Sequence, residues 1–155
     1  DFKSVKDTRP FMGPKFWCPD IQANNDGNNY KIFRYADAML MKAECLHAKG
    51  QYSDALKYLN MTRTRAGLDE YTDEIPENMM QEIRAERARE LFGEFQRKFD
   101  LVRWGIYYET VSEKSDYASL KTALKPCHRY YPIPDIEVAK SKYILDNKEY
   151  EQYGF

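Results

Sequence analysis

The 155-residue sequence lacks both a long apolar run and a surplus of one charge. No stretch approaches the roughly 20 apolar residues that a membrane-spanning helix needs. Its 24 lysine and arginine residues are balanced by 25 aspartate and glutamate residues, so the net charge is −1. A chain without a basic surplus has no overall field to steer it to nucleic acid or an anionic membrane. The sequence therefore predicts a soluble chain that does not bind nucleic acid.

The first 17 residues also lack the layout of a signal peptide, in which charged residues precede an apolar stretch. We therefore expect any export signal to lie upstream of this sequence. The length suits a single domain with one hydrophobic core, since two domains would each be small.

Residues that carry metal or acid–base chemistry are scarce. Cys18, Cys45 and Cys127 are odd in number and widely separated, so they form neither a metal-ligand motif nor a self-contained disulfide framework. His47 and His128 are isolated from each other. The sequence has no phosphate-binding glycine loop, no metal-binding histidine pair and no nucleophile elbow. It therefore predicts no metal, no cofactor and no catalytic residue.

Aromatic residues are abundant: 13 tyrosines, 8 phenylalanines and 2 tryptophans make up 15% of the chain. Most aromatic rings in proteins fill cores, and we expect the same of most of these. The alternative is that a few rings form exposed platforms that stack on the apolar C–H face of a sugar. The candidate ligand-binding residues are Trp17, Asn28 and Tyr30, although a core aromatic followed by a solvated loop is the favoured interpretation of this segment.

Helix-forming residues predict two antiparallel helices after an extended entry segment. Residues 1–32 are rich in proline and polar residues and are typical of extended chain and loop. Residues 33–66 predict a helical hairpin that turns at Gly50 and stops at Gly67. The hairpin has the length of a tetratricopeptide (TPR) repeat, about 34 residues, and places small and large residues in a similar order. No second copy follows, so the sequence does not predict a repeat array.

The remaining chain predicts a charged helix pair and then a looser tail. Pro76 suits the first turn of a third helix, and Gly93 predicts a bend or restart within 76–105. Residues 106–155 predict an irregular tail with short helices, packed through its tyrosines. The predicted fold is therefore mainly α, with TPR-like helical hairpins and long irregular, aromatic-rich connecting segments.

Opposite charges recur three residues apart between positions 86 and 103, as in Glu86 and Arg89 or Glu94 and Arg97. This spacing favours mutual pairing on neighbouring helical turns over two carboxylates that face a substrate. Carboxylate pairs of a glycoside hydrolase come together only in the fold, so that alternative stays open. The predicted structural charge network comprises Glu86, Arg89, Glu90, Glu94, Arg97, Asp100 and Arg103.

Four sequence blocks, in order, resemble the C-terminal part of the SusD/RagB family of outer-membrane glycan-binding lipoproteins. They are NNYKIFRYADAMLMKAECLHAKG, ALKYLNMTRTRAGL, IRAERARELFGEFQRKFDLVRWG and YYPIPDIEV. With a Tyr-Gly-containing end, their order and spacing extend over nearly all of residues 30–155. In the family, the matching framework segments are those at 34–37, 65–68, 86–91, 97–105 and 132–134. One departure is Glu94-Phe95, where the family often has Glu-Gly, and it predicts a different helix path at this point.

The resemblance implies that residues 1–155 are the C-terminal portion of a SusD-like domain. It implies a non-enzymatic receptor, outward-facing on the cell outer membrane and lipid-anchored through an upstream segment. Such a receptor captures an oligosaccharide or polysaccharide for a SusC-like TonB-dependent porin. The alternatives are a TPR-like protein-interaction scaffold without its own sugar binding and, more remotely, a glycoside hydrolase that uses Glu86 or Glu90.

Overall fold

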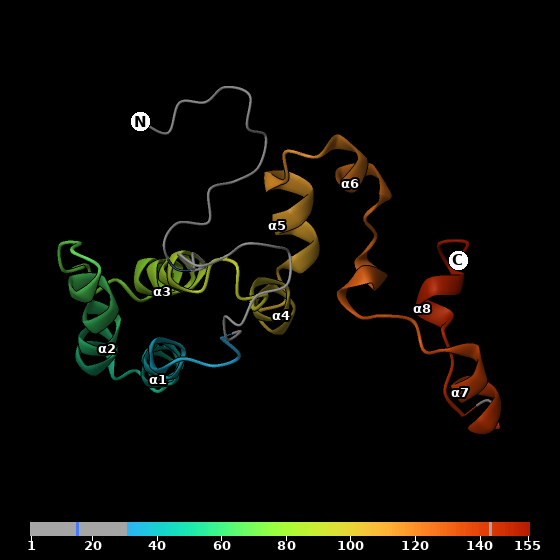
Figure 1. Ribbon diagram of the computed structural model, residues 1–155, viewed down its shortest axis with the longest axis horizontal. Coiled ribbons are helices and arrows are strands. Elements are labelled where there is room, and N and C mark those ends of the chain that lie inside the picture. Colours follow the sequence, from blue (N-terminus) through green and yellow to red (C-terminus); the bar gives the residue numbers. More distant parts are fainter. Residues whose placement is uncertain (1–14, 16–30, 143) are drawn as a thin grey trace, which may run out of the picture. The chain divides into compact units, whose positions relative to one another are not determined.

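The computed structural model describes residues 15, 31–142 and 144–155, which belong to two compact units, Asp1–Gln96 and Arg97–Phe155 (Figure 1). The described residues form helices, turns and loops, and no β-strand occurs among them. The prediction of a mainly α fold is confirmed.

The first unit contains helices α1 (Tyr35–Ala48), α2 (Tyr52–Arg65) and α3 (Pro76–Glu90). A short turn joins α1 and α2, and its Gly50 has a φ of 73°. The predicted helical hairpin is therefore confirmed, while its likeness to a TPR repeat stays a prediction. Pro76 begins α3 as predicted. Proline lacks a backbone N–H, but the first residue of a helix needs none because its N–H has no partner within the helix.

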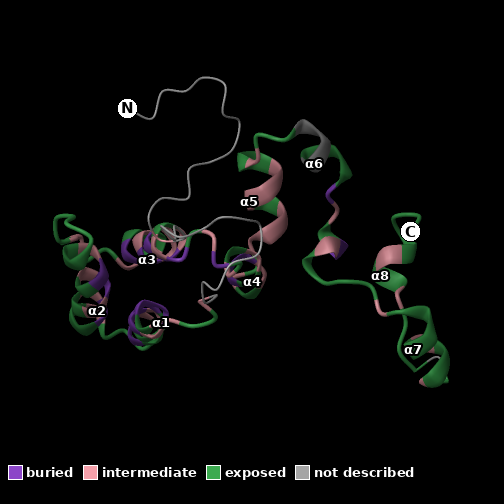
Figure 2. Cartoon of the chain, in the orientation of Figure 1, coloured by how far each residue is buried: buried purple, intermediate pink, exposed green. Residues whose placement is uncertain are grey.

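One apolar cluster lies between these three helices. Its alanines, Ala43 on α1 and Ala55 on α2, are fully buried and allow the two helices to approach closely. Burying a large aliphatic side chain contributes about 1.5–3 kcal/mol, so this cluster is the main stabilising feature of the unit. Figure 2 shows buried positions on all three helices. The buried members are Leu40, Ala43, Leu46, Ala55, Leu59, Met79 and Ile83.

The predicted stop at Gly67 is also confirmed. The N–H of Leu68 donates to the carbonyl of Arg63 and the N–H of Gly67 to that of Thr64, each at 3.0 Å. These two bonds define a Schellman motif, in which the residue after the helix adopts a left-handed conformation. Gly67 has a φ of 79°, which a glycine adopts without a steric penalty.

The predicted break at Gly93 separates α3 from α4 (Arg97–Arg103). Gly93 and Phe95 both adopt left-handed backbone conformations, with φ values of 76° and 59°. A left-handed conformation costs a non-glycine residue about 1–2 kcal/mol, so the backbone of Phe95 is strained. The Phe95 side chain is 77% exposed.

The second unit consists of short helices and extended connections. Leu101, Leu124 and Cys127 are its buried apolar residues among those described, whereas Cys45 of the first unit is exposed; both cysteines are free. Helices α5, α7 and α8 bury no residue, and Figure 2 shows them as intermediate or exposed. After α4, its elements are α5 (Tyr107–Lys114), α6 (Ala118–Ala123), the 3₁₀-helix η2 (Pro126–Arg129), α7 (Asp135–Lys140) and α8 (Lys148–Glu151).

None of the described helices is long and apolar enough to cross a membrane.

Candidate functional site

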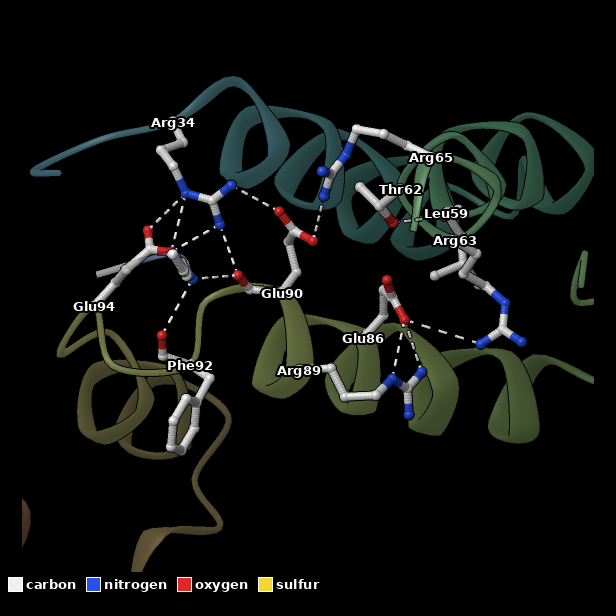
Figure 3. A network of polar contacts seen from close by, with 11 residues as sticks. Arg34, Leu59, Thr62, Arg63, Arg65, Glu86, Arg89, Glu90, Phe92 and Glu94 are labelled. Carbon is white, nitrogen blue, oxygen red and sulfur yellow. Dashed lines mark hydrogen bonds and ion pairs between the residues drawn. The ribbon is translucent and has the colours of Figure 1, made fainter. Parts of the chain in front are cut away.

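Arg34, the residue before α1, binds one carboxylate at the end of α3 and one in the turn after it (Figure 3). Its Nε donates to both carboxylate oxygens of Glu94, at 2.9 and 3.0 Å. Its Nη1 donates to Glu90 Oε1 at 2.7 Å, and its Nη2 donates to the Glu90 carbonyl at 2.6 Å. The planar guanidinium therefore joins the start of α1 to the end of α3 through charge-assisted bonds.

Lys15 and Arg65 extend this contact, which we call the Arg34 clamp. The Lys15 ammonium donates to the carbonyls of Glu90 at 2.7 Å and Phe92 at 3.1 Å, and it pairs with the Glu94 carboxylate. Arg65 from the end of α2 binds the second oxygen of Glu90. The side chains of Glu90 and Glu94 are only 9% and 3% exposed, so the clamp holds two nearly buried charges.

Ionisation of the clamp follows from these contacts. Burial alone would raise the pKa of Glu94, but hydrogen bonds from Arg34 and Lys15 outweigh burial and hold its pKa below the ordinary value. The hydrogen bond to Glu94 is also the main reason that the pKa of Arg34 is raised. Both groups are therefore charged at neutral pH, and their attraction is retained until Glu94 is protonated.

A second cluster surrounds Glu86, whose side chain is 2% exposed. Arg89 donates to Glu86 Oε2 through Nε at 3.1 Å and Nη2 at 2.7 Å, and Arg63 of α2 lies 3.9 Å from the same oxygen. Glu82 pairs with both arginines. Figure 3 shows the guanidinium groups of Arg63 and Arg89 directed at the Glu86 carboxylate.

Asp37 and Arg87 form a buried ion pair between α1 and α3, with Arg87 Nη1 2.8 Å from Asp37 Oδ1. Their side chains are 9% and 3% exposed. This pair could not be predicted from the sequence, because its members are 50 positions apart. The one available signal was that Asp37 ends the Arg-Tyr-Ala-Asp block of the family.

In the second unit, Arg103 donates to Asp100 Oδ1 through Nε at 3.0 Å, and its Nη2 lies 2.9 Å from the same oxygen. The guanidinium groups of Arg97 and Arg103 lie 5.7 and 4.7 Å from the centre of the Trp104 ring. Among the predicted network residues, the structure therefore pairs Glu86 with Arg89 and Asp100 with Arg103. It also brings Glu90 and Glu94 together, because both bind Arg34. Arg34, Arg63 and Arg65, which sequence reasoning missed, bind carboxylates of α3 and the turn after it.

The sequence-predicted ligand residues Trp17, Asn28 and Tyr30 lie outside the described residues. The described part of the chain also has no cluster of three or more histidine, cysteine or acidic residues that could hold a metal ion.

A tyrosine-lined hollow of about 280 Å³ lies within the second unit, and we call it the aromatic hollow. The Lys98 ammonium lies 3.9 Å from the centre of the Tyr131 ring and 5.5 Å from that of Tyr107. Such distances allow cation–π attraction to both rings. The lining residues are Lys98, Tyr107, Ala123, Leu124, His128, Tyr130, Tyr131 and Tyr150.

A second hollow of about 440 Å³, the outer hollow, shares Tyr130, Tyr131 and Tyr150 with the first. Asn147 in its wall binds both backbone groups of Ile133, with two hydrogen bonds of 2.8 Å. These bonds fix the Pro-Ile-Pro segment beside the tyrosines. The Tyr150 hydroxyl donates to the Tyr130 carbonyl, which holds the shared wall in place.

Burial, followed by the nearby thiol of Cys127, raises the pKa of Tyr150. Its phenol therefore stays neutral at physiological pH and remains a hydrogen-bond donor. The rings of Tyr150 and Phe155 lie 5.8 and 5.3 Å from the His128 ring, and these three residues form an aromatic cluster. Two of its members, His128 and Tyr150, line the hollow.

Residues 15–150 match the sequence profile of the SusD family. The chain belongs to this family, and the resemblance found in its sequence blocks is confirmed.

Two proteins named as SusD or SusD-like are similar to this chain. SusD-like protein P25 of Formosa agariphila is 32% identical over 152 residues, which cover 89% of this chain and 28% of that protein. Starch-binding protein SusD of Bacteroides thetaiotaomicron is 28% identical over 135 residues, or 86% of this chain and 24% of that protein. The chain thus spans about a quarter of the length of these relatives.

A crystal structure of a SusD superfamily protein from Bacteroides vulgatus has a similar fold. The match has a TM-score of 0.62 and 33% sequence identity, and it covers 72% of this chain and 25% of that one. Sequence and fold therefore indicate the same family.

Proposed function

We propose that this protein is a carbohydrate-binding member of the SusD family. Family membership is the observation that carries the proposal, together with the 28% identity to a relative named as a starch-binding protein. The residues of the aromatic hollow also support carbohydrate binding. Tyr130 and Tyr131 are 58% and 77% exposed, and exposed ring faces suit stacking on the C–H face of a sugar.

The protein acts as a receptor and not as a hydrolase in this proposal. The carboxylates of Glu86 and Glu90, which a hydrolase would use, are nearly buried and bound by arginines. A general acid must reach the proton acceptor of its substrate and keep a pKa near the working pH. Carboxylates held between guanidinium groups suit a structural role instead.

By its resemblance to the family, the receptor faces outward at the cell outer membrane, anchored by lipid through a segment upstream of this chain. It captures an oligosaccharide or polysaccharide there and passes it to a SusC-like TonB-dependent porin. The helical hairpin of α1 and α2 favours one other candidate, a TPR-like interaction scaffold without its own sugar binding.

Calorimetry of the full chain with a panel of neutral and acidic oligosaccharides tests the proposal. We expect saturable binding of at least one glycan, and fluorescently labelled glycan should remain intact after prolonged incubation. Cleavage that is lost in Glu86→Gln or Glu90→Gln would instead indicate a hydrolase. Capture of the porin encoded beside this protein, with no affinity for any glycan, would favour the scaffold.

A further inference from the structure

We propose that the aromatic hollow binds a sugar residue that carries an anionic group, with the Lys98 ammonium as its counter-charge. The inference rests on the proposed function. It adds the chemical class of the ligand and the location of the binding site. It depends on three features of the second unit: the pairing of its cations, the placement of Lys98 between rings, and the donors around the hollow.

Several other cations of the second unit have carboxylate partners. Arg129 pairs with Glu149, Lys140 with Glu137, and Lys148 with Asp146, at 2.7 to 2.9 Å. Among the residues that the structure describes, no carboxylate forms an ion pair with Lys98. Its ammonium contacts the faces of Tyr131 and Tyr107 instead. The aromatic hollow thus has a positive charge that an anionic ligand would complement.

The position of this charge increases its effect on a ligand. Lys98 is half-buried, and the hollow beside it is lined mainly by tyrosine rings and the buried Leu124. Attraction between opposite charges is stronger beside apolar surface than in open water. The two ring faces also hold the ammonium in place, so little side-chain freedom remains to be lost on binding.

The remaining lining groups suit a sugar ring more than a simple inorganic anion. Tyrosine rings form most of the wall and provide surfaces for C–H stacking. His128 Nδ1 accepts the backbone N–H of Lys125 at 2.9 Å, so in the neutral ring the proton lies on Nε2. The imidazole therefore retains a donor for a hydroxyl or carboxylate oxygen.

The size of the hollow limits the ligand. About 280 Å³ lies at the small end of the range for ligand pockets, roughly 300–1,000 Å³. This volume suits one sugar residue, and the adjoining outer hollow extends the surface past Tyr130 and Tyr131. We therefore expect recognition of one charged residue within or at the end of a glycan.

The test is calorimetry of the full chain with three trisaccharide probes: a uronic acid oligomer, a sulfated galactan fragment and a neutral galactan fragment. We expect the wild type to bind an anionic probe about tenfold more tightly than the neutral one, as one charge-assisted hydrogen bond of about 1.5 kcal/mol would give. Lys98→Met should abolish this preference, and Lys98→Arg should restore most of it. Lys140→Met, which removes an exposed cation paired with Glu137, is the matched control and should change nothing.

The outcomes separate the inference from the proposed function. Binding of no glycan at all contradicts the proposed function. Neutral binding without anionic preference contradicts only the inference, as does a preference that persists in a folded Lys98→Met protein. Equal binding of uronic and sulfated probes supports recognition of charge alone, whereas binding of the uronic probe only supports a carboxylate ligand.

Discussion

The helices of the first unit surround a closed apolar cluster, while those of the second unit bury little. Helices α1, α2 and α3 each contribute fully or nearly fully buried side chains, and arginines neutralise the carboxylates between them. Helices α5, α7 and α8 bury none, and tyrosine rings and local hydrogen bonds dominate their contacts.

This difference indicates that the first unit contributes mainly to stability and that the second unit contributes the surface for recognition. Buried apolar area stabilises the first unit, and arginines already bind its nearly buried carboxylates, so few of its groups remain for a ligand. The second unit keeps its rings and Lys98 at the surface, and regions with few buried contacts are those that open or adapt most easily.

Leu59→Ala should have the largest effect, because Leu59 is fully buried in the first-unit cluster. We expect it to lower the free energy of unfolding by about 4 kcal/mol, within the range for leucine truncation in a packed core. Leu124→Ala, at a 4% exposed position of the second unit, should cost less because its looser surroundings can collapse. Denaturant melts measure both, and an equal cost would contradict the contrast.

Asp37→Asn should cost about 3 kcal/mol, because it removes the carboxylate that forms a buried ion pair with the Arg87 guanidinium. Asp100→Asn is the second-unit counterpart. Its partner Arg103 is 41% exposed, and water can solvate that guanidinium after the substitution, so we expect a smaller loss. If Asp100→Asn left the unfolding midpoint unchanged but removed glycan binding, the assignment of Asp100 to a structural network would be wrong.

Glu94→Gln should destabilise the first unit in a pH-dependent way. At pH 7 we expect a loss of about 2 kcal/mol, typical of charge-assisted hydrogen bonds. Because the folded pKa of Glu94 is below its ordinary value of 4.5, the wild-type advantage is present above that value and is lost as the pH falls through the lowered pKa. Denaturant melts of the wild type and Glu94→Gln from pH 7 to pH 3 measure the difference between their free energies of unfolding. Glu137→Gln, in an exposed pair, should show almost none.

Phe95→Gly should give the smallest effect and the opposite sign. The substitution relieves the left-handed strain of about 1–2 kcal/mol but adds chain entropy to the unfolded state, so we expect a gain below about 1 kcal/mol. Phe95→Ala provides the matched comparison, since it removes the ring and keeps the strain. A destabilising Phe95→Gly together with a neutral Phe95→Ala would contradict the backbone explanation.

Local features of the fold could be predicted from the sequence, and long-range partners could not. The stop at Gly67 and the break at Gly93 depend on neighbouring residues, so composition and spacing were enough to locate them. The spacing of charges predicted pairing of Glu86 with Arg89. It gave no indication that Arg34 binds Glu90, because their contact depends on how α1 packs against α3 across 56 positions.

The candidate site was harder to predict for a related reason. The high aromatic content indicated that some rings are exposed, but it could not tell which of them share a surface. Tyr107 and Tyr131 flank Lys98 because α4, α5 and the segment after η2 converge within the second unit. Short helices were predicted within residues 106–155, but the bounds of α5 could not be predicted, since its apolar residues bury no continuous face.

The free thiols of Cys45 and Cys127 give the two units different chemical reactivity. Cys45 is exposed on α1 and should react with a thiol reagent at once, whereas Cys127, 2% exposed in η2, should react only when the second unit opens. The labelling rate of Cys127, resolved by mass spectrometry, therefore reports the opening frequency of the segment that carries His128 and Tyr130. A ligand held in the aromatic hollow would slow this reaction in proportion to its occupancy.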